Sequence, residues 1–64
     1  MSSPEFVQRN LQRVLKTRGE AAARKVLAVF TGDWDVDALA DFAKMVSSDA
    51  RPMVLSEVER RRNT

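Results

Sequence analysis

The residues of this 64-residue chain that could do chemistry are mainly its basic side chains. Near the N-terminus three of them recur at intervals of four and three residues, which places them in one row on a helix. Near the C-terminus three arginines follow one another. Cationic groups clustered in this way suit contacts with phosphates, although a solvated helix face has the same appearance. The candidate nucleic-acid contacts are therefore Arg9, Arg13, Lys16, Arg60, Arg61 and Arg62.

Catalysis is not expected. The chain has no Cys, His or Tyr, so it offers no nucleophile paired with a general base. Asp33, Asp35 and Asp37 alternate like the first ligands of a calcium loop, but Ala38 and Lys44 stand where that loop needs Gly and a bidentate Glu. We expect no metal and no cofactor, and we assign these carboxylates to the start of a helix, where its dipole favours negative charge.

A third kind of chemistry is contact with another protein. Aromatic residues and Met are enriched in binding surfaces, yet the same residues also fill small cores, and both roles remain open here. A chain this short has more apolar surface than three short helices readily cover, which favours self-association or a partner. The candidate protein-binding residues are Phe6, Trp34, Met45, Met53, Leu55 and Val58.

The formal net charge of +2 hides an uneven distribution of charge. Six basic against two acidic residues give +4 in residues 1–31, one against five gives −4 in residues 32–50, and four against two give +2 in residues 51–64. Such a basic, acidic, basic order can pair segments within one molecule or between two. The N-terminus does not resemble a signal peptide, and no stretch is apolar enough to cross a bilayer. We expect a cytoplasmic protein without membrane contact.

Four helices are expected to position these groups, at about residues 4–18, 20–31, 36–47 and 53–61. Ser3, Pro4 and Glu5 form a start signal for the first. Gly19 either ends that helix, with Thr17 and Glu20 as a capping box for the next, or lies within one continuous helix; we favour a break. The second helix is apolar over a wide arc and is expected to be the most buried.

The third helix is the clearest. Gly32 can adopt the left-handed conformation that closes the preceding helix, and Asp35 can cap the next one. Trp34 and Leu39 then have the spacing of a hydrophobic staple. The last helix either begins at Pro52 or follows an extended Met53-Val54-Leu55, with Ser56 as its cap and Glu59 completing a capping box. Residues 60–64 are expected to fray.

These elements predict an all-α fold: three or four short helices in a small bundle or an interlocked dimer, forming a single domain over residues 1–64. No strand-like alternation or internal repeat is present.

One segment, from Lys44 to Arg60, resembles the C-terminal motif of some ParD- and RelB-like antitoxins. The resemblance rests on Lys44-Met45-Val46, Asp49-Ala50-Arg51-Pro52 and Ser56-Glu57-Val58 with Arg60. The spacings differ by one or two residues, Leu55 replaces the usual Pro, and the first 43 residues do not match. The resemblance implies a C-terminal segment that folds on a toxin, and an N-terminal part that dimerises and binds operator DNA.

The sequence thus favours a small, non-enzymatic helical protein–protein interaction module, a homodimer acting as a regulator or adaptor. The alternative is a small DNA-binding transcriptional regulator or antitoxin-like protein that uses the basic first helix and the arginine tail.

Overall fold

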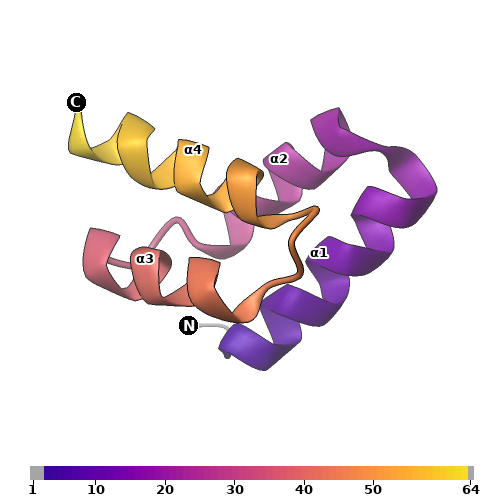
Figure 1. Ribbon diagram of the computed structural model, residues 1–64, viewed down its shortest axis with the longest axis horizontal. Helices are drawn as coiled ribbons and strands as arrows, with labels where there is room; N and C mark the ends of the chain where they lie inside the picture. Colours follow the sequence, from indigo (N-terminus) through magenta and orange to yellow (C-terminus); the bar gives the residue numbers. More distant parts are fainter. Residues whose placement is uncertain (1–2, 64) are drawn as a thin grey trace.

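The computed structural model describes residues 3–63, and within them it contains four helices and no strand. The helices are α1 (Pro4–Arg18), α2 (Glu20–Phe30), α3 (Val36–Met45) and α4 (Arg51–Arg62). α1 packs mainly against α2 and α3 against α4, so the bundle consists of two helical hairpins that lie against each other (Figure 1). The prediction of a small all-α bundle is confirmed.

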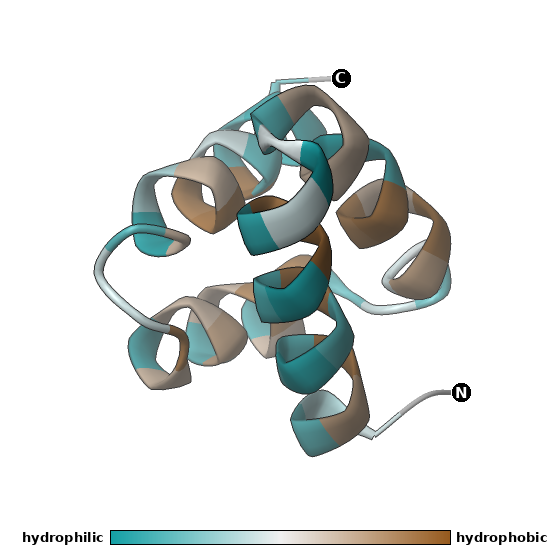
Figure 2. Cartoon of the chain, turned by 90° about the vertical axis from the view of Figure 1, so that its right-hand side faces the viewer, coloured by the Kyte–Doolittle hydropathy of each residue, from teal (hydrophilic) through white to brown (hydrophobic). Residues whose placement is uncertain are grey.

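The core is built by all four helices of one chain, together with the residues that connect them. Phe42, Leu11, Leu27 and Leu39 are among its largest side chains. The other buried apolar residues are Val7, Ala23, Trp34, Ala43, Val46, Ala50, Met53, Val54 and Val58. Viewed from the side of α1, much of the ribbon of this helix that faces the viewer has the hydrophilic colour (Figure 2), and Val7 and Leu11 of α1 are buried. Since one chain closes this core, an interlocked second chain is not needed to form it.

The break between α1 and α2 occurs at Gly19, as predicted. Its φ of 89° and ψ of 178° lie in a region that only glycine adopts readily. The predicted capping box is wrong: the Thr17 hydroxyl donates to the Arg13 carbonyl within α1, and Glu20 binds Arg24. The backbone of glycine, rather than a side-chain cap, makes this turn.

Replacing Gly19 with Ala should destabilise the fold by about 1–3 kcal/mol, because the residue must keep a positive φ. Gly32→Ala is the matched control. Its added Cβ would meet the Ala28 carbonyl oxygen at an ordinary 3.4 Å, and its φ is not positive. We expect a change within about 0.5 kcal/mol there. Urea denaturation of both variants measures the difference, and equal destabilisation would show that the Gly19 conformation carries no strain.

The turn between α2 and α3 is made differently from the prediction. Gly32 is not left-handed, because Thr31 caps α2: its backbone N–H donates to the Leu27 carbonyl, and its buried hydroxyl donates to the same oxygen at 2.6 Å. Asp35 caps α3 as expected, with its carboxylate accepting the Ala38 N–H at 2.7 Å. Trp34 and Leu39 are both buried in the core.

The second half of the chain departs most from the predicted boundaries. α3 ends at Met45 rather than at residue 47, because Val46 is extended. α4 begins at Arg51, one residue before Pro52, after a turn in which the Ser47 carbonyl accepts the N–H groups of Ala50 and Arg51. The predicted start at Pro52 is one residue late, and the alternative of an extended Met53–Leu55 segment capped by Ser56 is wrong, because these residues lie within α4.

The predicted fraying is also wrong for residues 60–62, because α4 continues to Arg62. The last residue of that predicted tail, Thr64, lies outside the described residues.

Candidate functional site

The structure does not bring the six candidate protein-binding residues together. Trp34, Met53 and Val58 are core residues. The Trp34 ring meets Phe42 edge to face, with ring centroids 5.3 Å apart. Its buried indole N–H has no hydrogen-bond partner within residues 3–63. Packing in the core accounts for these three side chains, so any contact surface rests on the other three.

The remaining candidates, Phe6, Leu55 and Met45, are 50%, 46% and 39% exposed and lie in different places. Phe6 is on α1, with its ring centroid 5.8 Å from that of Phe30 on α2. Met45 ends α3, and Leu55 lies on α4. Leu55 lines a groove.

That groove lies between α3 and α4, has a volume of about 510 Å³ and is lined mostly by apolar atoms. Ala40 and Ala43 are its small α3 residues, while Leu55 contributes from α4. Lys44 and Arg51 bring positive charge to one end. Sequence analysis found only Leu55. The sequence gives little indication of the other lining residues, since Ala40 and Ala43 have the pattern of any amphipathic helix.

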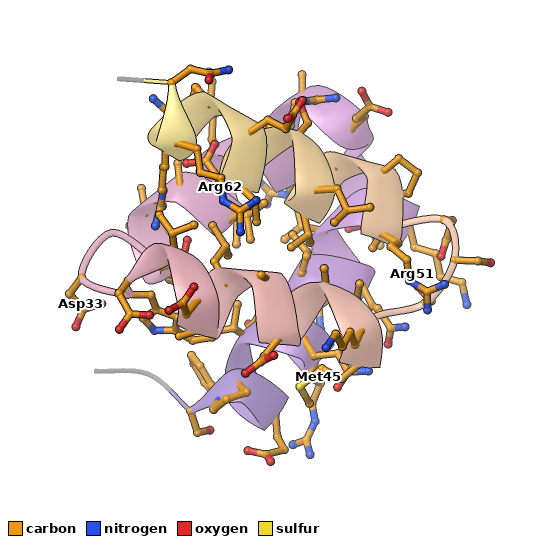
Figure 3. All side chains as sticks on the ribbon, turned by 60° about the vertical axis from the view of Figure 1, so that its left-hand side comes forward. Asp33, Met45, Arg51 and Arg62 are labelled. Carbon is orange, nitrogen blue, oxygen red and sulfur yellow. The ribbon has the colours of Figure 1, made fainter. Side chains whose placement is uncertain are left out.

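Charge changes sign along α3. Asp35 caps its first turn and Asp37 lies within that turn, whereas Lys44 lies in its last turn. Figure 3 shows Asp33 beyond one end of this helix, and Met45 and Arg51 at the opposite end. α3 itself is therefore acidic at its start and basic in its last turn, while the arginines at the end of α4 lie near that start, where Arg61 binds the Thr31 and Trp34 carbonyls. The exposed pair of Lys44 with Asp41, at 3.7 Å, neutralises this polarity little.

Arg51 has a structural role beside the groove. Its guanidinium donates to the carbonyl oxygens of Ala43 and Val46 at 3.1 and 3.2 Å, and the Gln8 amide donates to the Met45 carbonyl at 3.0 Å. These side chains satisfy carbonyls that the end of α3 leaves free. The groove is thus framed by a fixed helix end.

Arg61, one of the candidate nucleic-acid contacts, is part of the fold. Its guanidinium donates to the Thr31 carbonyl and hydroxyl at 2.8 and 3.0 Å, and to Glu57 at 2.9 Å, with 16% of the side chain exposed. Arg60 also binds Glu57. Hydrogen bonds from Arg60 and then Arg61 hold the pKa of the Glu57 carboxyl below its ordinary value, against the opposing effect of burial. Arg62 is exposed and takes no part in these contacts.

The α1 row has a different environment. Arg9, Arg13 and Lys16 are exposed and line a hollow of about 460 Å³. Gln12 of α1 and two residues of the α3–α4 connection, Ser47 and Asp49, complete its lining. The pKa of Asp49 is lowered, first by the hydrogen bond from the Ser47 hydroxyl, then by backbone N–H groups and by the charge of Lys16. This surface keeps its predicted residues together.

Residues 3–63 contain no group of three or more His, Cys, Asp or Glu side chains placed to hold a metal ion. In the same part of the chain, no helix combines the length and apolar character needed to cross a membrane.

Comparisons with known proteins found no family model, no curated protein and no solved structure that matches this chain. The antitoxin resemblance therefore gains no support from them. Its implied toxin-binding segment is helix α4, which buries Met53, Val54 and Val58 in the chain's own core. The class that the structure itself defines is a small all-α bundle of two helical hairpins.

Proposed function

We propose that this protein is a small, non-enzymatic helical protein–protein interaction module that acts as a regulator or adaptor, and that a second copy of the chain occupies the groove between α3 and α4. The observation that carries the proposal is a half-exposed Leu55 in a groove that Ala40 and Ala43 also line. Covering an exposed Leu with a helix is favourable, because it removes apolar surface from water.

Small residues also set how closely a second helix can approach. Ala40 and Ala43 have no atoms beyond Cβ, so a helix packed over them can come nearer than over larger side chains. This favours a helix, rather than a loop, as the occupant of the groove.

The charges of α3 favour a second copy in a two-fold arrangement. If two α3 helices cross antiparallel near Ala40, the acidic start of each meets the basic end of the other. The sequence spacing then pairs Asp37 of one copy with Lys44 of its partner, and the two-fold axis produces this pair twice. Complementary charge of this kind fixes register more than it adds affinity.

Sedimentation equilibrium over concentrations reaching about 1 mM tests the proposal. We expect a reversible dimer that Leu55→Glu weakens at least about tenfold, because burying a carboxylate costs desolvation free energy where burying Leu gains it, even with Lys44 and Arg51 lining the same groove. Val29→Glu is the matched control: it makes the same kind of change on α2, at a side chain that is 75% exposed and outside the groove. That variant should dimerise like the unaltered chain.

A charge exchange then tests the antiparallel register. Asp37→Lys and Lys44→Asp should each weaken the dimer, and the double variant should restore it, because both inter-chain pairs are re-formed with reversed sign. A chain that stays monomeric, or a dimer that Leu55→Glu and Val29→Glu weaken equally, would rule out the second copy as the occupant. Failure of the double variant to recover would refute the antiparallel register.

A further inference from the structure

Beyond the proposed self-association, we infer that the outer face of α1 binds the phosphate backbone of double-stranded nucleic acid through Arg9, Arg13 and Lys16. The site is the hollow that these side chains line with Gln12, on a different surface from the α3–α4 groove.

The length of the row fits a phosphate backbone. Arg9 and Lys16 are seven residues apart, which is about 10 Å along a helix. Each strand of a duplex presents one phosphate for about every 3.4 Å of its axis. The row therefore spans about three phosphates of one strand.

The three cations of this row are also close together and, in the described part of the chain, are not held by ion pairs. Within residues 3–63, Arg9, Arg13 and Lys16 form no ion pair. By contrast, Arg24 binds Glu20, and both Arg60 and Arg61 bind Glu57. A phosphate at the α1 row would meet cations that no carboxylate already holds.

One carboxylate does face the hollow. Asp49 lines it opposite α1, but its carboxylate accepts a hydrogen bond from the Ser47 hydroxyl. With Asp49 included, the net charge of the lining residues is +2 instead of +3. The surface remains cationic.

The surroundings of the row favour a duplex over other polyanions. A helix that lies on a membrane inserts an apolar stripe beside its cations, but in α1 Val7 and Leu11 are fully buried in the core, and Phe6 is an isolated exposed aromatic residue rather than part of a stripe. Single-stranded nucleic acid is bound by stacking bases on aromatic rings, and none of the residues that line the hollow is aromatic. The outer face of α1 is therefore suited to charge contacts with a phosphate backbone.

Fluorescence anisotropy with a labelled DNA duplex of random sequence, measured at several salt concentrations, tests the inference. Three phosphate contacts predict a slope of about −2.7 for log K against log salt, which is a loss of roughly 40-fold between 50 and 200 mM salt. The variant Arg9→Gln/Arg13→Gln/Lys16→Gln should lose at least about tenfold in affinity at low salt, and its slope should approach zero.

The matched control is Arg18→Gln/Lys25→Gln/Arg62→Gln, which removes the same three charges from exposed positions outside the hollow. It should bind within about twofold of the unaltered chain. Circular dichroism verifies folding of both variants. If the α1 triple variant fails to fold, Arg13→Gln alone decides the matter, with an expected change in slope of about 0.9.

Four results would overturn the inference: no binding of the duplex at the lowest salt, equal loss of binding in the control variant, tighter binding of single-stranded DNA, or tighter binding of vesicles that contain phosphatidylserine. An unchanged slope in Arg13→Gln would do the same where that variant has to decide.

Discussion

Replacing Phe42 with Ala should unfold much of the protein at 25 °C. The Phe42 side chain is 1% exposed and packs edge to face against Trp34. Truncating a buried Phe costs about 3–5 kcal/mol, because apolar contacts are lost and a cavity remains. A chain of 64 residues has a total stability of only about 3–10 kcal/mol. The variant should therefore lose most of its cooperative thermal transition, as measured by circular dichroism and by the fluorescence of Trp34.

Val29→Ala is the control for this prediction. Val29 is 75% exposed, so its truncation should change the free energy of unfolding by less than about 0.5 kcal/mol. A Phe42→Ala protein that melts within a few degrees of the unaltered chain would show that the α3 packing described above does not hold the fold together.

Replacing Arg61 with Gln should destabilise the protein by about 2–3 kcal/mol, far more than the same change at its neighbour Arg60. Arg61 joins the last turns of α4 to the end of α2, through the Thr31 carbonyl and hydroxyl. Its loss leaves the Thr31 oxygens and one side of Glu57 without their charged donor, and hydrogen bonds to charged groups contribute about 1.5–3 kcal/mol. Urea denaturation measures the effect.

Arg60→Gln removes the same charge from a side chain that is 61% exposed and that binds Glu57 on its own helix. We expect it to destabilise the protein far less than Arg61→Gln does, because an exposed ion pair contributes little. If both variants were destabilised equally, the contribution of Arg61 would come from charge near Glu57 and not from the link to α2.

Local signals in the sequence were enough to predict the four helices. The Ser3 and Asp35 caps, the Gly19 break and the apolar face that includes Val7 and Leu11 all depend on residues within one or two helical turns of each other. Such information is present in any short window of the chain.

The boundaries that were wrong depend on contacts across longer distances in the chain. α3 ends two residues early where Gln8, 37 positions before Met45, binds the Met45 carbonyl, and where Arg51 binds two others. α4 stays ordered to Arg62 where Arg61 reaches Thr31, 30 positions away. No local pattern specifies these partners.

The candidate sites were predicted unevenly for a related reason. The α1 row needs only helical spacing, and its three residues do lie together. The protein-binding set needed knowledge of which apolar residues the core would use. Trp34, Met53 and Val58 are part of the core. Val29, which belongs to the apolar second helix, is exposed instead. The wide apolar arc also did not make α2 the most buried helix, because α3 and α4 each bury more residues.

The pairing of helices that are neighbours in the chain has a kinetic consequence. Because α1 packs mainly on α2 and α3 mainly on α4, most contacts join residues close in sequence, and little chain entropy is lost in bringing them together. Each hairpin can form on its own timescale, with docking of the two hairpins as the one step that needs distant segments to meet. Helical proteins with such local connectivity refold in microseconds to milliseconds.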